Sequence, residues 1–227
     1  MNAPPVRPQS VTRIQHNVLS RGERRVLNWL CARLPEWVTP DKLTLLALAS
    51  SGVIFLAYVL SNFSRDWLWL AVAGYVTHWF GDSLDGSIAR YRQIERPRYG
   101  YFIDHSCDGI GNLLIVGGIG LSPYVRFDIA LLALTGYLLL AVHTFLVAKV
   151  MNEFPMSHLG AGPTELRLIL IGMTIAMFVA GPRASMVSGF SAFDLFVGAI
   201  AAILVTVFVV QTWRIGNLLA RRDRGRS

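Results

Sequence analysis

The sequence predicts an all-α integral membrane protein with six transmembrane helices, preceded by an N-terminal amphipathic helix at the membrane interface. Three observations lead to this prediction. Hydrophobic residues make up 53% of the 227 residues and charged residues only 15%, a balance too apolar for an ordinary soluble domain. Six stretches are almost free of charge. The basic residues gather in every second segment that connects these stretches.

The N-terminal region divides into two parts. Residues 1–19 are rich in proline and polar side chains and lack the apolar core of a signal peptide, which predicts a disordered tail. In residues 20–38, apolar side chains recur at helical spacing among several arginines. We therefore expect an amphipathic helix that lies on the anionic inner leaflet, with a disordered basic arm as the alternative. The apolar positions of that helix are Val26, Leu27, Leu30 and Leu34.

Six apolar stretches follow within residues 39–214, the predicted transmembrane domain. Each approaches the roughly 20 residues that a helix needs to cross about 30 Å of hydrocarbon. Helices are expected because backbone polar groups in lipid must pair with one another. Pro40 and Asp41 are typical of a helix start, and the second stretch is expected to continue as a helix to about Arg90. The stretches are 43–64, 67–81, 99–125, 129–148, 168–182 and 195–213.

The distribution of basic residues predicts the orientation in the membrane. Of the 21 Lys and Arg residues, 18 lie in the two terminal segments and the loops that share their side. This asymmetry predicts cytoplasmic termini, with residues 215–227 as a basic cytoplasmic tail. It also accounts for the net charge of +7 without nucleic acid as a partner. The three basic residues of the opposite loops are Arg65, Arg126 and Arg183.

Four aspartates lie at helical spacing near the cytoplasmic ends of the second and third stretches. Asp82 and Asp85 share one helix face, and Asp104 and Asp108 share another. The short loop 91–99 predicts two antiparallel neighbouring helices, which would bring both pairs together. Carboxylates this close repel one another unless cations neutralise them, so the pattern predicts a site for one or two Mg²⁺ or Mn²⁺ ions. Solvated acids at helix ends would explain one or two of these residues, but not matched pairs.

The acidic residues belong to a longer motif. Residues 82–90 read D-x2-D-G-x2-A-R and residues 100–108 read G-x3-D-x3-D, which resembles the signature of the CDP-alcohol phosphotransferases. The six stretches, the amphipathic N-terminal segment and the chain length are also similar to this family. One departure is the spacing of nine residues between Arg90 and Gly100, where the family usually has one or two fewer. The difference falls in a polar loop, where an insertion is tolerated.

The resemblance implies an enzyme of phospholipid synthesis with its active site on the cytoplasmic side. An alcohol or lipid acceptor attacks a CDP-linked donor, CMP leaves and a phosphodiester forms. The resemblance also implies that Asp82, Asp85 and Asp104 bind the metal and that Asp108 is a further ligand or the general base. Family members are often homodimers, so a homodimer is expected. The implied CDP-binding residues are Asp82, Gly86, Ala89, Arg90 and Gly100.

Two residues that open the fifth stretch are further candidates. Glu165 and Arg167 are predicted to bind the acceptor or to brace the site. A plain helix start, with Thr164 as the cap and Glu165 beside the positive end of the helix dipole, is the alternative.

Histidines near the aspartates are less specific. His105 is predicted to lie at the rim of the site or to form a His–carboxylate base, as in the choline- and ethanolamine-phosphotransferase branch. In that branch an acid precedes the histidine by one helical turn, where this chain has Tyr101. His78 and His143 are expected to be buried, hydrogen-bonded residues of the bundle.

Two other functions are compatible with acids near a membrane. A membrane prenyltransferase also holds Mg²⁺ and a diphosphate with acidic helix motifs, but its motifs lie far apart in sequence, whereas these four aspartates fall within 27 residues. A cation transporter would be expected to show acids at the membrane midplane, broken helices and repeats. The identities of the donor and the acceptor are open at this stage.

Overall fold

The computed structural model of the protein describes residues 20–151, 163–182 and 189–224. The predicted tail 1–19 lies outside these residues. Within them the chain forms seven α-helices joined by short connections. The helices are α1 (Ser20–Cys31), α2 (Pro40–Leu60), α3 (Trp67–Tyr91), α4 (Pro97–Leu121), α5 (Phe127–Met151), α6 (Pro163–Ala180) and α7 (Ala192–Arg224).

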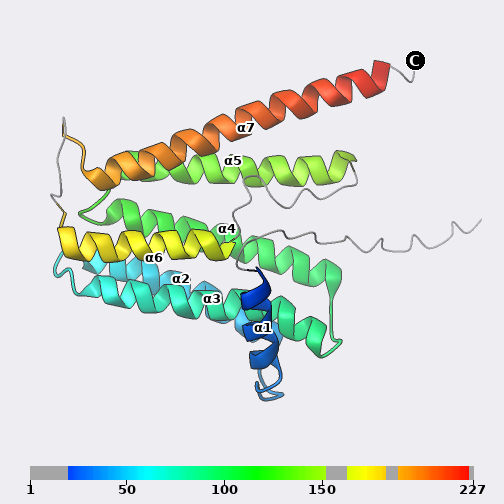
Figure 1. The fold of residues 1–227 in the computed structure, drawn as a ribbon, viewed down its shortest axis with the longest axis horizontal. Helices are drawn as coiled ribbons and strands as arrows, with labels where there is room; N and C mark the ends of the chain where they lie inside the picture. The colour runs from blue at the N-terminus through cyan, green and yellow to red at the C-terminus, as the bar shows by residue number, and fades with distance from the viewer. Residues whose placement is uncertain (1–19, 152–162, 183–188, 225–227) are drawn as a thin grey trace, which may run out of the picture.

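Six of the helices run along the long axis of the molecule, and α1 lies crosswise to them (Figure 1). α2 packs against α3 and α4, α5 packs against α4 and α7, and α6 packs against α3. Polar contacts join three of these helices inside the core. The hydroxyl of Tyr58 lies 3.2 Å from that of Tyr75 and 2.6 Å from that of Thr174, which links α2 to α3 and α6.

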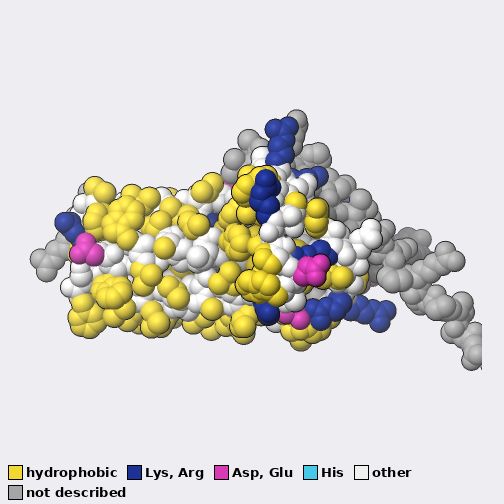
Figure 2. All heavy atoms as spheres, turned by 90° about the horizontal axis from the view of Figure 1, so that it is seen from below, with side chains coloured by type: hydrophobic (Ala, Val, Ile, Leu, Met, Phe, Trp, Pro, Cys, Tyr) yellow, Lys and Arg dark blue, Asp and Glu magenta, His cyan; other side chains and the backbone are white. Residues whose placement is uncertain are grey.

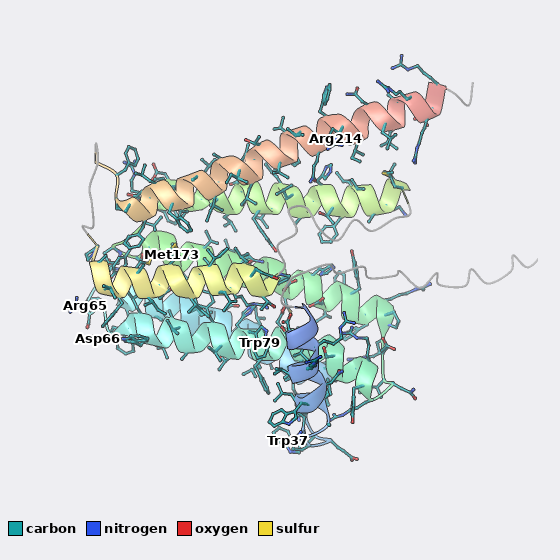
Figure 3. The ribbon with its side chains drawn as sticks, viewed as in Figure 1. Trp37, Arg65, Asp66, Trp79, Met173 and Arg214 are labelled. Carbon is teal, nitrogen blue, oxygen red and sulfur yellow. The ribbon has the colours of Figure 1, made fainter. Side chains whose placement is uncertain are left out.

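Helices α2, α5, α6 and α7 are long and apolar enough to cross a membrane. Charged side chains gather toward the two ends of the long axis, and a largely hydrophobic band lies between them (Figure 2). Arg65 and Asp66 mark one of these ends (Figure 3). Four of the six predicted membrane crossings thus correspond to helices that are long and apolar enough to span a membrane. α3 and α4 are less apolar, because each contains a polar turn with two of the aspartates, and their crossing stays a prediction.

The helix boundaries follow local sequence signals. α2 begins with Pro40, and the hydroxyl of Thr39 accepts a hydrogen bond from the backbone N–H of Lys42 at 3.4 Å, as in an N-cap. α3 continues without a break through the motif to Tyr91, as predicted. α7 extends as a helix to Arg224, so residues 215–224 of the predicted tail are helical.

The prediction that α3 and α4 pack directly as neighbours is wrong for most of their length. α2 packs against both helices, and α3 and α4 make few direct contacts. Glycines allow this close approach. A Cβ atom on Gly81 would lie 2.6 Å from the carbonyl oxygen of Leu43, and one on Gly111 would lie 3.0 Å from the hydroxyl of Ser51. The two pairs of aspartates therefore meet beside α2, with space between them.

Candidate active site

A small cavity lies between α2, α3 and α4. All four predicted aspartates line it, although they come from two helices that pack mainly on α2. The remaining lining residues are mostly small or polar. The full lining is Thr44, Ala47, Leu48, Ser51, His78, Asp82, Asp85, Asp104, Cys107 and Asp108.

The carboxylates form a compact cluster. Asp85 is buried, with 8% of its surface exposed, and Asp82 and Asp108 line the same cavity. Asp104 lies one turn before Asp108 on the same face of α4. The helical spacing seen in the sequence therefore brings both pairs to one place, as predicted.

Thr44 of α2 orients one of these acids. Its hydroxyl donates a hydrogen bond of 2.7 Å to Oδ2 of Asp85, and the backbone N–H of Gly86 lies 2.5 Å from Oδ1 of the same carboxylate. Sequence reasoning missed Thr44. The available signal was a polar side chain at the second position of the first apolar stretch.

Arg167 of α6 pairs with Asp82 through a charge-assisted hydrogen bond. The side chains are 11% and 19% exposed, respectively, so little water screens the pair. Nη1 of Arg167 is buried and has no hydrogen-bond partner among the described residues. Arg167 thus contacts one of the motif aspartates, and its role as a brace or as an acceptor ligand stays a prediction. Glu165 is not among the residues that line the cavity.

His105 lies beside the α4 carboxylates. Its Nδ1 is 3.6 Å from Oδ2 of Asp104 and 3.8 Å from Oδ2 of Asp108. The ring packs edge-on against Tyr101, with 4.3 Å between the ring centroids. Tyr101 therefore supports the imidazole through ring packing at the position where the choline- and ethanolamine-phosphotransferase branch carries an acid.

The donor set fits a divalent cation. Three residues of α4 each offer one ligand atom, and these atoms lie within 4.8 Å of one another: Asp104, His105 and Asp108. Asp82 and Asp85 line the cavity together with Asp104 and Asp108. Carboxylate oxygens are the ligands that Mg²⁺ and Mn²⁺ prefer. Arg167 offsets the charge of one carboxylate, and the cluster retains an excess of negative charge that a cation would neutralise.

The other motif residues surround the cavity without lining it. Gly86 faces mainly the side chain of Arg90, whose Nη1 would lie 3.3 Å from a Cβ atom built on the glycine. Because only this flexible tip fills the space, Gly86 is not required for helix packing. Ala89 is partly buried and Gly100 is exposed.

The two histidines expected to be structural differ. His143 lies 3.2 Å from the hydroxyl of Thr212, in agreement with a bundle hydrogen bond. His78 lines the cavity one turn from Asp82, and its Nδ1 has no hydrogen-bond partner among the described residues. The prediction that His78 is hydrogen-bonded within the bundle is therefore wrong for Nδ1, because that atom is buried and no described side chain or backbone group reaches it.

Residues 37–213 match the family described as CDP-alcohol phosphatidyltransferase. This match covers most of the chain, including every helix that contributes to the cavity. The chain belongs to the CDP-alcohol phosphatidyltransferase family. Membership favours this chemistry over the prenyltransferase and transporter alternatives, and the apolar helices agree with an integral membrane protein.

Two curated relatives illustrate the range of this family. The chain is 27% identical over 128 residues to cholinephosphotransferase 1 of Gallus gallus, covering 50% of this chain and 38% of the relative. It is 29% identical over 99 residues to archaetidylinositol phosphate synthase of Pyrococcus horikoshii, covering 44% of this chain and 50% of the relative. The chain thus spans half or less of the length of these CDP-alcohol phosphatidyltransferase relatives.

Proposed function

We propose that this protein is a metal-dependent CDP-alcohol phosphotransferase that transfers a substituted phosphoryl group from a CDP-linked donor to a hydroxyl acceptor in phospholipid synthesis. The observation that carries the proposal is the cavity where the four motif aspartates meet in a member of this family. The gathering of carboxylates around open space is typical of a site that binds a cation together with a phosphate group.

The four aspartates would hold one or two Mg²⁺ or Mn²⁺ ions. The bound cation would offset the negative charge of the donor diphosphate and of the departing CMP. The hydroxyl of Thr44 fixes one oxygen of Asp85, and Arg167 fixes one oxygen of Asp82, so both carboxylates are oriented before substrate arrives. Such preorganisation reduces the rearrangement needed at the moment of reaction.

Asp108 is the proposed general base. One carboxylate oxygen takes the proton of the acceptor hydroxyl, and the acceptor oxygen then forms a bond to the phosphorus that carries the donor alcohol. The bond from that phosphorus to the oxygen of CMP breaks, and CMP leaves with the bonding electron pair. His105, 3.8 Å from Asp108, can receive the proton afterwards.

The CDP moiety is proposed to bind along the α3 motif. Gly86 and Ala89 would lie against the cytidine, and Arg90 would swing from its position over Gly86 to meet the diphosphate. Gly100 would let the ligand approach the start of α4. Glu165 and Arg167 are the candidates for the acceptor side, with Arg167 also bracing Asp82.

The proposed orientation puts the site and both termini on the cytoplasmic side. The excess of Lys and Arg in the segments on that side supports this orientation. α1 lies crosswise to the other six helices (Figure 1), an arrangement that is compatible with a helix in the membrane interface. To test this orientation, single cysteines would be placed in the α2–α3 and α3–α4 connections. Their labelling would then be measured in intact cells.

Release of CMP by the purified protein tests the function. CDP-diacylglycerol would be offered with glycerol phosphate, serine or inositol, and CDP-choline or CDP-ethanolamine with diacylglycerol, each with Mg²⁺ or Mn²⁺. We expect CMP and one phosphodiester lipid from a single donor–acceptor pair. The names of the two relatives point to different alcohols, so both donor classes belong in the assay. No CMP release from any pair would refute the proposal.

The mass of the protein in detergent tests the expected homodimer.

A further inference from the structure

Glu23 is an acidic residue on the packed face of α1. It continues the line of Leu27, Leu30 and Leu34, which pack against α3, and it is itself partly buried. Its neighbours Arg24 and Arg25 are exposed on the other face. An acid on an otherwise apolar stripe requires polar partners, because an unpaired carboxylate is costly to bury.

Three side chains donate hydrogen bonds to Oε1 of Glu23. Nε1 of Trp79 lies 2.9 Å away, and the hydroxyl of Ser83 lies 3.5 Å away, both on α3. The hydroxyl of Thr164, at the start of α6, lies 2.6 Å away. Trp79 lies beside α1 (Figure 3). One carboxylate oxygen therefore joins α1 to two other helices.

The partners of Glu23 flank the Asp82–Arg167 pair. Trp79 precedes Asp82 by three residues and Ser83 follows it directly, whereas Thr164 precedes Arg167 by three residues on α6. Because Arg167 binds Asp82, the contacts form a closed ring that runs from Glu23 through α6 to Asp82 and back through α3. Breaking the contact to Glu23 would open this ring and release the start of α6 from α1.

α1 is itself held firmly enough to act as an anchor. At its other end, the guanidinium of Arg92 donates hydrogen bonds to backbone carbonyls that follow α1, at 2.6 to 3.3 Å. Between the two ends, α1 packs on Leu84 and Ile88 of α3. The carbonyl groups bound by Arg92 belong to Leu34, Pro35, Glu36 and Val38.

We propose that Glu23 is a positioning residue, which holds the start of α6 so that Arg167 stays on Asp82 and fixes the orientation of that carboxylate. α6 packs mainly against α3, so the Glu23–Thr164 bond is a principal polar contact of its first turn. The inference rests on the proposed function, because it assigns Asp82 its role in cation binding. Partners of ligating carboxylates affect metal affinity or activity by about 10- to 100-fold.

The test compares Glu23→Ala, Glu23→Gln and Thr164→Val with the unmodified full-length protein in detergent. Turnover is measured as CMP release, Mn²⁺ affinity by electron paramagnetic resonance, and folding by thermal unfolding. We expect Glu23→Ala to lower kcat and weaken Mn²⁺ binding by about 10-fold or more. Glu23→Gln keeps an acceptor oxygen at the same reach and should recover most of both losses. Glu36→Ala, an exposed carboxylate next to α1, is the matched control and should change neither.

A double-mutant cycle separates positioning from general stability. In an Arg167→Lys protein, Glu23→Ala should lower kcat by less than threefold further, because the contact that Glu23 supports is already altered. Multiplicative losses would overturn the proposal, as would unchanged kcat and Mn²⁺ affinity in folded Glu23→Ala. If Glu23→Ala does not fold, Thr164→Val, which removes only one hydroxyl, decides the question by the same two measurements. An inactive wild-type protein would instead refute the proposed function.

Discussion

Arg167 of α6 binds Asp82 of α3, although 85 residues separate them in the sequence. The pair lies at the edge of the cavity and joins the first aspartate of the motif to a helix outside it. The guanidinium offsets the charge of one of the four carboxylates, and the other three line the same cavity. The site is therefore built from one motif together with several residues of α2 and one residue of α6.

Asp108→Asn should nearly abolish turnover while leaving the fold and most donor binding intact. The amide keeps the shape of the side chain but cannot take the proton of the acceptor hydroxyl, so we expect kcat to fall by about 10²- to 10⁴-fold. CMP release gives kcat, and binding of a CDP-linked donor is measured separately. Asp128→Asn, an exposed acid at the other end of the bundle, is the control. A kcat within tenfold of the wild-type value would remove Asp108 as the base.

Removal of divalent cations should stop the reaction. Treatment with a chelator is expected to reduce CMP release to background, and added Mg²⁺ or Mn²⁺ should restore it. Asp82→Asn and Asp104→Asn should each raise the Mn²⁺ concentration needed for half-maximal rate by at least about 10-fold, because each removes one anionic ligand. Full activity in excess chelator would contradict a metal-dependent mechanism.

The convergence of the aspartates could be predicted because it depends on local geometry. Spacings of three and four residues on continuous helices fix which side chains share a face, and the short α3–α4 connection limits where the two faces can meet. Pro40 and Asp41 likewise indicated the start of α2. These features depend on residues close together in sequence, so a single chain contains enough information to infer them.

The long-range partners could not be predicted in the same way. Thr44, His78 and Glu23 acquire their roles only when α2, α3 and α1 pack together, and no local spacing indicates which helices do so. The position of α2 beside both α3 and α4 follows from close approach at Gly81 and Gly111. No local spacing distinguishes a glycine that permits close helix packing, such as Gly81, from one that is free to contact a ligand, such as Gly86, whereas the structure does.

Gly86 and Gly81 should respond differently to alanine. At Gly81 the added methyl group would lie 2.6 Å from the backbone oxygen of Leu43, so we expect a loss of about 1–3 kcal/mol in stability. At Gly86 it would meet only the flexible end of Arg90, so the fold should be unaffected. If cytidine lies there, the methyl group should raise the KM for the CDP donor by roughly 10-fold.

Thermal unfolding and donor KM values measure both changes. Gly109→Ala is the control, since its added methyl group has no neighbour within 4 Å, and it should leave both quantities close to wild type. If the KM of Gly86→Ala for the CDP donor equals that of the wild-type protein, this would argue against cytidine at this position. A stable Gly81→Ala protein would show that α2 and α3 can separate without cost.

The two cysteines should differ in reactivity toward a maleimide. Cys107 lines the cavity, so its modification should fill the space between the carboxylates and abolish CMP release. Cys31 is only 3% exposed, so the reagent has little access to its sulfur, whereas Cys107 is partly exposed. We expect labelling of Cys107 alone, as seen by peptide mass spectrometry, and protection of this residue by a CDP-linked donor with Mg²⁺.

Cys107→Ser supplies the matched control for this experiment. It keeps a small side chain at the cavity wall and should retain turnover, while losing sensitivity to the reagent. Cys31→Ser should remain as sensitive as the wild-type protein. Full turnover after complete modification of Cys107 would mean that the donor does not enter the cavity between α2, α3 and α4, because an adduct there leaves no room for a diphosphate among the aspartates.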